Sequence, residues 1–369
     1  MRYFEQQDSK AFSDIGYQNY ILQGVSRTFA LTIPLLPLQL REAVGNAYLL
    51  CRIADTIEDD PGMPVEQKRY LSERLLNVIA GSESAQDFAL NLRAALSTKT
   101  PVAELDLVDH TDRVVRLTHS FSANQRAAIS RCVAIMAKGM VYYQENPPDK
   151  GLKNMRDLDD YCYYVAGVVG ELLTQLFCDY LQGQGEPTAE LETVMMPLAI
   201  SFGQGLQMTN ILKDIWDDSG RDVCWLPRSV FDPYGVDLSD LVAARQLPGF
   251  TEGIKELIGI THAHLRNAVE YSLLIPAREV GIRRFCLLCT SLAVLSLRKL
   301  HSQPALSAGK QVKVSKTTLY SAIRVCNTFA GSDVMVRLLF RLSTLGLPAG
   351  EIHASSPASS IDLQGKPWW

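Results

Sequence analysis

The segment 40–60, LREAVGNAYLLCRIADTIEDD, decides the fold class, because apolar or small residues recur along it at three- and four-residue spacing. This spacing predicts an amphipathic α-helix with one buried face. Almost every long segment of the chain shows the same spacing, and alternating, strand-like runs are few. The sequence therefore predicts an all-α protein. The buried stripe of this first helix carries Leu40, Val44, Ala47, Tyr48 and Cys51 and continues into Asp55, Glu58 and Asp59.

Composition excludes several classes of protein. With 47% hydrophobic and 21% charged residues in 369, the chain is too apolar to be disordered. A net charge of -4 gives no global basic field, so nucleic acid is not an expected partner. The longest apolar run, 285–297, is shorter than the roughly 18 to 20 residues of a membrane span, and residues 1–10 lack the apolar run of a signal peptide. We therefore expect a cytoplasmic protein in which most of the eight scattered cysteines are reduced core residues.

Loop signals are short, and none is long enough to be a domain linker. They include Asp60–Gly62, Gly81–Ser82 and Asn146–Pro148. The simplest organisation is one helical domain over residues 1–345. Residues 346–369, rich in Ser, Pro and Gly towards the end, are expected to form a flexible tail.

Two acidic pairs carry the chemistry. Asp55 and Asp59 are four residues apart, so they project side by side from one helix and repel each other unless a cation is present. The alternative for this pair is a solvated helix end before Pro61. A second pair, Asp214 and Asp218, lies in SFGQGLQMTNILKDIWDDSG at 201–220.

The second pair belongs to a longer polar stripe on an otherwise apolar helix, which is expected to line a cavity. Two facing pairs could hold several Mg2+ ions, which bind a few carboxylates together with water and phosphate oxygens. Nearby cations would bind a phosphorylated ligand, and the alternative for each is a surface ion pair. The stripe residues are Gln207, Asn210, Asp214 and Asp218, and the cations are Arg52, Lys213 and Arg221.

Four motifs, in order and spacing, resemble the squalene/phytoene synthase family: SRTF at 26–29, YLLCRIADTIEDD at 48–60, YCYYVAGVVG at 161–170 and QMTNILKDIWDD at 207–218. The resemblance covers about residues 20–340. It implies an isoprenoid-synthase-type helical bundle around a central cavity. It also implies a Mg2+-dependent enzyme that joins two isoprenoid diphosphates head to head.

The resemblance makes Asp55, Asp59, Asp214 and Asp218 the metal-binding carboxylates and Tyr161 the catalytic tyrosine. Small residues at 166, 167 and 170 leave room either for a packed helix or for an isoprenoid tail. Lys213 stands where animal and fungal squalene-forming members usually have Arg, and Glu171 follows VAGVVG as in bacterial dehydrosqualene-forming members. The implied substrate contacts are Ser26, Arg27, Phe29, Tyr48, Arg52, Gln207, Asn210, Lys213 and Arg221.

The segments 285–300 and 309–323 resemble the region that squalene-forming members of the family use with NADPH. The resemblance places Phe285 and Cys286 at the substrate, and Lys310, Lys313 and Lys316 at the cofactor's phosphates. The alternative for the lysines is a solvated basic turn. The sequence has no G-x-G-x-x-G fingerprint, so a Rossmann fold would not hold the NADPH.

The expected reaction joins two farnesyl diphosphates to presqualene diphosphate and then reduces this intermediate with NADPH to squalene. Peripheral membrane contact is expected for release of so apolar a product. One alternative is a non-reducing enzyme that makes dehydrosqualene or phytoene. Another is a non-catalytic helical assembly protein of the same family, against which the presence of both acidic pairs and Tyr161 argues.

Overall fold

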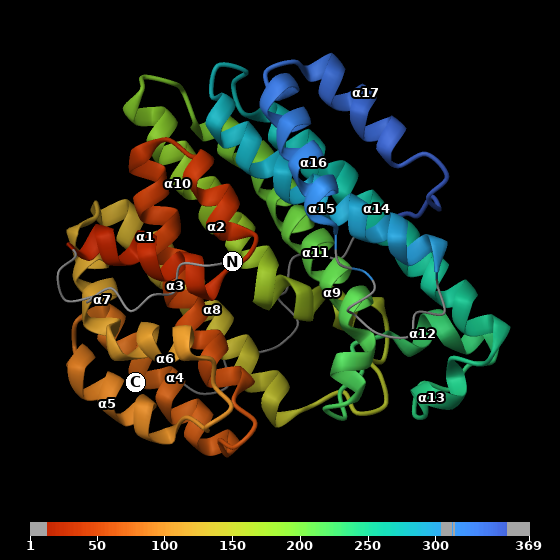
Figure 1. Cartoon of the computed structure of the whole chain (residues 1–369), viewed down its shortest axis with the longest axis horizontal. Helices are drawn as coiled ribbons and strands as arrows, with labels where there is room; N and C mark the ends of the chain where they lie inside the picture. Colours follow the sequence, from red (N-terminus) through yellow and green to blue (C-terminus); the bar gives the residue numbers. More distant parts are fainter. Residues whose placement is uncertain (1–12, 304–311, 313, 353–369) are drawn as a thin grey trace. The chain divides into compact units, whose positions relative to one another are not determined.

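The computed structural model describes residues 13–303, 312 and 314–352. These residues are built from helices joined by short loops (Figure 1). Within the described part of the chain there is no β-strand, only one isolated bridge between Leu152 and Pro227. The prediction of an all-α fold is confirmed. The chain divides into two compact units, whose placement relative to each other is not determined.

Unit 1 comprises described residues 13–146, 168–197 and 272–289. Its longest helices, α3 and α8, pack against each other, and α3 also contacts α1, α6, α7 and α10. The helices of unit 1 are α1 (Asp14–Val25), α2 (Phe29–Thr32), α3 (Leu38–Asp59), α4 (Val65–Ala80), α5 (Ala85–Ala95), α6 (Val102–Asp109), α7 (Thr111–Ser120), α8 (Ala123–Glu145) and α10 (Val168–Gly183).

Buried polar contacts fix α3 inside unit 1. Asn46 donates from Nδ2 to the Val114 carbonyl at 2.8 Å and accepts from Thr118 Oγ1 at 2.7 Å. On another face, a Cβ at Gly45 would lie 2.7 Å from Nε2 of Gln18, so a larger residue here would require the Gln18 side chain to move. Because buried polar groups with satisfied partners specify one packing arrangement, these contacts set the direction of the acidic turn that ends α3.

Unit 2 comprises described residues 147–167, 198–271, 290–303, 312 and 314–352. Three of its long helices begin or end in unit 1. Its elements are α9 (Met155–Cys162), a π-helical turn (Tyr163–Gly167), α11 (Ala189–Ser219), α12 (Arg228–Phe231), α13 (Leu241–Ala244), α14 (Pro248–Leu274), α15 (Val280–Ser302), α16 (Lys316–Phe329) and α17 (Asp333–Ser343).

The small residues that follow Tyr161 serve helix packing. Gly203 of α11 lies so close to the π-helical turn that an added Cβ would be 2.8 Å from Cα of Gly167. Gly167 in turn lies next to Ile200 of α11. Of the two alternatives for the small residues at 166 and 167, the packed helix is therefore the one present in unit 2.

All eight cysteines are unpaired and buried, which confirms that they are reduced core residues. One described helix, α15, is long and apolar enough to cross a membrane by length and composition alone. Most of its apolar window is buried in the fold, which is also the pattern of a core helix. The single domain over 1–345, its central cavity and the flexible tail stay predictions.

Candidate active site

The first group of predicted site residues forms a column along α3 in unit 1. Tyr48, Arg52, Asp55 and Asp59 follow one another at three- and four-residue spacing on this helix. The Tyr48 ring lies 5.0 Å from the ring of Phe29, and the Tyr48 hydroxyl donates to the Val25 carbonyl at 3.0 Å. The SRTF motif is therefore brought next to the start of the column.

The SRTF motif is itself held by a short turn. Ser26 Oγ accepts a hydrogen bond from the Phe29 backbone N–H at 2.9 Å, which closes the turn that leads into α2. Arg27 lies between these two residues and is exposed. Burial raises the pKa of the neighbouring Tyr48 hydroxyl above its ordinary value, so this phenol is neutral at physiological pH.

Arg52 is held between two carboxylates. Its Nη2 donates to Glu104 Oε1 at 2.6 Å, and its Nη1 lies 3.5 Å from Asp55 Oδ2. Its Nε is buried and has no hydrogen-bond partner within the described residues. A buried donor without an acceptor costs about 1–3 kcal/mol. This unsatisfied donor is the kind of group that an anionic ligand oxygen could accept from.

The carboxylates at the end of α3 are electrostatically crowded. Burial, together with the charge of Asp59, raises the pKa of Asp55 to about 7 against the opposing effect of Arg52. Burial, Asp55 and Asp59 likewise raise the pKa of Glu58 to about 8. The Asp55 side chain keeps 32% of its surface exposed and Asp59 is exposed, so the pair borders solvent. A cation bound here would offset the burial and the carboxylate repulsion that together raise both pKa values.

The next acid in the motif has a different role. Both carboxylate oxygens of Asp60 accept hydrogen bonds, from the backbone N–H of Gly62 at 2.8 Å and from that of Ser97 at 2.7 Å. A third bond comes from the Thr100 hydroxyl at 3.1 Å. These hydrogen bonds outweigh its burial and lower the pKa of Asp60. Asp60 therefore closes the turn after α3.

The second group of predicted residues lies at the end of α11 in unit 2. Lys213 Nζ is 3.1 Å from Asp214 Oδ2 and donates to Asn210 Oδ1 at 3.0 Å. Arg221 Nη2 lies 2.6 Å from Oδ1 of Asp218. Burial raises the pKa of Asp218, and Arg221 opposes that rise. Each predicted cation is thus beside a predicted carboxylate, while Gln207 is half-buried on the same helix.

Tyr161 is buried in unit 2, and its ring stacks on that of Trp225, with centroids 3.6 Å apart and planes inclined by 8°. Trp225 is fixed by its neighbours, because Cys224 donates to the Pro148 carbonyl and Leu226 accepts from the N–H of Leu152. Trp225 and Asp218 also line one small hollow. Tyr161 is therefore linked to the carboxylate end of α11 through Trp225.

The remaining predicted residues are placed as follows. Phe285 and Cys286 are buried in unit 1, where the Phe285 ring meets that of Phe177 edge to face at 6.4 Å. Lys316 is exposed at the first position of α16. Lys310 and Lys313 lie outside the described residues. Within the described residues, no three His, Cys, Asp or Glu side chains form a group that could hold a metal ion.

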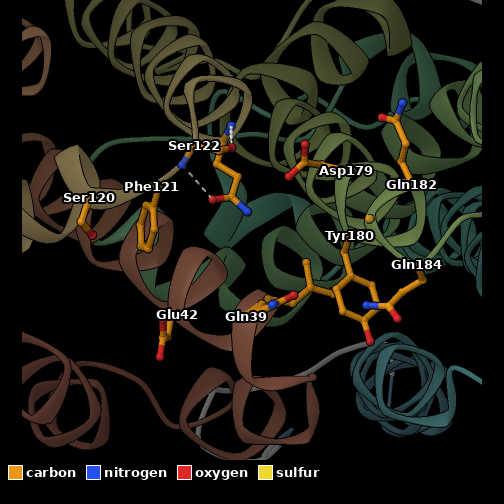
Figure 2. A pocket seen from close by; sticks show the side chains of 12 residues that line it. Gln39, Glu42, Ser120, Phe121, Ser122, Asp179, Tyr180, Gln182 and Gln184 are labelled. Atoms are coloured by element: carbon orange, nitrogen blue, oxygen red, sulfur yellow. Dashed lines mark hydrogen bonds between the residues drawn. The ribbon is translucent and has the colours of Figure 1, made fainter.

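Unit 1 also has a separate polar groove of about 640 Å3, shown in Figure 2. None of the predicted site residues lines it. Its lining includes the carboxylates of Glu42 and Asp179 but no Lys or Arg, so it is not suited to a diphosphate.

Three residues beside the predicted site were not predicted as part of it. Glu58 lies on the acidic turn and appears in the stripe that the sequence reveals, so its spacing was a usable signal. Glu104 and Trp225 come from other segments of the chain and contact Arg52 and Tyr161 only through the fold. No periodicity in the sequence indicates these two contacts.

A family model described as squalene/phytoene synthase matches residues 22–318. The chain belongs to this family. Three curated relatives are similar to it: the squalene synthase of Cyberlindnera jadinii is 28% identical over 87% of this chain and 69% of its own length. The squalene synthase ERG9 of Candida albicans (strain SC5314) is 28% identical over 84% of this chain and 67% of its own length. Squalene synthase 1 of Arabidopsis thaliana is 27% identical over 76% of this chain and 64% of its own length. The chain thus spans about two thirds of the lengths of these squalene/phytoene synthase relatives.

Solved structures share the fold of this squalene/phytoene synthase family member. TcSQS in complex with the ligand BPH1237 has a TM-score of 0.71 at 23% identity, over 93% of each chain. A dehydrosqualene synthase in complex with a ligand has a TM-score of 0.62 at 19% identity, over 86% of this chain and 97% of that one. At these identities the likeness shows the helical fold. Family membership and the relatives together support a prenyltransferase-type enzyme.

Proposed function

We propose that this protein is a squalene synthase. It would join two farnesyl diphosphates head to head to presqualene diphosphate, and then reduce this intermediate with NADPH to squalene. The observation that carries the proposal is the α3 column, in which Arg52 keeps a buried unsatisfied donor one turn before a pair of crowded carboxylates. The family and its squalene synthase relatives supply the reaction class.

The cations beside the carboxylates would bind the diphosphates. Arg52 offers a planar guanidinium whose Nη groups are held by carboxylates and whose Nε is unsatisfied. Arg221 is exposed and adjoins Asp218, while Lys213 adjoins Asp214. Guanidinium groups bind phosphate oxygens in a bidentate manner and Lys acts as a point charge, so both kinds of cation suit this ligand.

The carboxylates would hold Mg2+. Two oxygen-donor pairs, Asp55/Asp59 and Asp214/Asp218, suit an ion that takes a few carboxylates and completes its shell with water and phosphate oxygens. The raised pKa values of Asp55 and Asp218 fit the same role, because each carboxylate is partly desolvated and favours a nearby positive charge. Bound Mg2+ would supply charge stabilisation to the departing diphosphate.

Tyr161 and Trp225 would act at the hydrocarbon end of the substrate. Their stacked rings present aromatic faces, which attract a carbocation through the ring quadrupole. The Tyr161 hydroxyl would support removal of the proton whose loss closes the cyclopropane of presqualene diphosphate. Because a phenol has a pKa near 10, it acts in this step only with help from the departing diphosphate.

The reductive step would use the C-terminal third of the chain. Lys316 stands at the start of α16, where helix N–H groups and the lysine charge both favour phosphate oxygens. Lys310 and Lys313, which precede it in the sequence, would add to this charge. Phe285 and Cys286 would contribute to a dry wall, because water reaching the rearranging cation would give alcohols.

One incubation tests the proposed function. The full chain is supplied with farnesyl diphosphate and Mg2+, with and without NADPH, and the products are separated by chromatography. Presqualene diphosphate without NADPH and squalene with it are expected. Dehydrosqualene or phytoene formed regardless of NADPH would instead establish the non-reducing reaction. A folded protein that forms no condensation product would favour the assembly-protein alternative.

A further inference from the structure

The helix α17 exposes a continuous apolar stripe. Val334, Leu338 and Leu342 lie on it at four-residue spacing, and Leu345 follows just beyond its end. Side chains at this spacing share one helix face. Their exposed fractions are 76%, 46%, 58% and 76% in chain order, so the stripe has no protein partner within the described residues.

The opposite face of α17 is firmly attached to unit 2. The Phe340 ring lies 5.8 Å from the ring of His262 in α14, and Val336 is buried. From α15, Arg298 donates to the Ser343 carbonyl at 2.7 Å. Arg337 forms an ion pair with Glu270 of α14. The helix is therefore attached to unit 2 through its inner face, and the exposed stripe is a fixed feature of its outer face.

Positive charge lies beside the stripe. Arg337 and Arg341 are one helical turn apart, and on a helical wheel they fall next to Val334 and Leu345. Between residues 314 and 345 the sequence has four basic residues and a single acidic one, Asp333, although the whole chain has a net charge of -4. The C-terminal helices are thus a local basic region on an acidic protein.

This combination distinguishes among the partners that could cover the stripe. Arg337 is paired with Glu270, but a second copy packed face to face would bring the Arg341 side chains of both molecules together, which like-charge repulsion disfavours. An anionic bilayer complements both features, because acyl chains accept the apolar side chains and long arginine side chains reach the phosphates. An exposed apolar stripe flanked by arginines is the pattern of a helix that lies in a membrane interface.

We propose that the outer face of α17 docks this protein on the surface of an anionic lipid bilayer. The four apolar side chains enter the boundary between headgroups and acyl chains, and Arg341 contacts lipid phosphates. The binding itself rests on α17 alone. Its use, to deliver a hydrocarbon product directly into lipid, rests on the proposed function.

Vesicle binding tests the proposal. The full chain is co-sedimented with vesicles of equal parts phosphatidylcholine and phosphatidylglycerol, and with vesicles of phosphatidylcholine alone. Binding is expected to the anionic vesicles and to weaken with added salt. The double variant Leu338→Gln/Leu342→Gln should lose about 10-fold or more in partitioning, and Arg341→Gln about 5-fold. Leu90→Gln, which changes a 70% exposed leucine of α5 in unit 1, is the matched control and should bind as the native protein does.

Several results would overturn the proposal. Native protein that ignores anionic vesicles, or a double variant that binds them as well as native protein, refutes it. A full-chain Trp368→Ser/Trp369→Ser variant that binds where native protein does not would show that the chain's own C-terminal segment covers the stripe. A dimer without lipid that Leu338→Gln dissociates would show a second copy there. Circular dichroism confirms that each variant is folded.

Turnover separates this proposal from the proposed function. In detergent micelles, where no bilayer is needed for product release, the α17 variants should make squalene at the native rate. If native protein binds anionic vesicles but makes no condensation product in micelles, the docking surface stands and the proposed function fails. If native protein makes squalene but does not bind vesicles, the proposed function stands and the docking surface fails.

Discussion

Replacing Asp55 with Asn should stabilise the metal-free protein and at the same time remove its activity. In the folded protein, burial and Asp59 raise the pKa of Asp55 from 3.8 to about 7. An acid whose pKa is raised on folding is uncharged in the fold at low pH and carries an unfavourable charge at high pH. The stability of the native protein should therefore fall as pH rises from about 4 to about 7 and stay low above it.

The size of this effect follows from the shift. A rise of about 3 pKa units corresponds to about 4 kcal/mol, but the side chain is about one third exposed and solvent screens its charge, so we expect about 1–2 kcal/mol. Asn carries no charge at any pH. The difference in unfolding free energy between Asp55→Asn and native protein should thus grow from near zero at pH 4 to about 1–2 kcal/mol above pH 7.

Urea unfolding in EDTA, followed by circular dichroism across this pH range, measures the difference. Glu73→Gln is the matched control, because it changes an exposed carboxylate of α4 in unit 1 and should leave the pH profile of the native protein unchanged. Adding Mg2+ at pH 8 should stabilise native protein more than Asp55→Asn. Turnover of farnesyl diphosphate by the variant should fall by about 100-fold or more, the loss of several kcal/mol of charge stabilisation. A variant that is no more stable than Glu73→Gln in EDTA at pH 8, or that turns over normally, would refute the reasoning.

Three further predictions follow from the other residues of the site. Tyr161→Phe, which keeps the stack on Trp225, should slow presqualene diphosphate formation more than it changes substrate KM, and an unchanged rate would exclude the hydroxyl from this step. Lys313→Ala/Lys316→Ala should raise the apparent NADPH requirement and divert product towards alcohols or dehydrosqualene; unaltered NADPH dependence would exclude these lysines. Asp60→Asn should lower the unfolding free energy by about 1–3 kcal/mol near pH 7, because it weakens hydrogen bonds in the turn. The loss should become smaller as pH falls through the depressed pKa of Asp60. A variant as stable as native protein would refute this role.

Local sequence predicts the helices and their ends well, because both depend on neighbours along the chain. The α3 helix ends at Asp59, directly before the predicted loop at Asp60–Gly62, and α8 ends at Glu145, directly before Asn146–Pro148. Gly81, the predicted end of α4, adopts a φ of 80°, which glycine tolerates better than other residues. The π-helical turn after Tyr161 was not predicted; it packs closely against Gly203 of α11, a contact that local sequence does not indicate.

The site is less predictable than the fold, because its electrostatics depend on contacts between distant segments. The sequence places Arg52 three residues before Asp55, but it does not show that Glu104, from α6, holds the guanidinium. In the same way, nothing in the local sequence places Trp225 on the ring of Tyr161. The resemblance to the family identified the site residues, and the fold shows which neighbours contact them.

Two acids five residues apart show why a motif alone does not define a site. Asp55 and Asp60 belong to the same acidic run, and residue type alone gives no reason to assign them different chemistry. In the fold, burial raises the pKa of Asp55. The Arg52 guanidinium, 3.5 Å away, lowers it and the neighbouring carboxylate of Asp59 raises it, so the net shift is upward. Asp60 instead satisfies backbone donors, and its pKa falls. Asp55, whose carboxylate favours a further positive charge, is therefore suited to bind a metal ion. Asp60, whose oxygens already accept hydrogen bonds, is suited to stabilise the turn. Opposite pH dependences of stability for the two Asn variants would therefore separate the ligand from the structural residue without any activity assay.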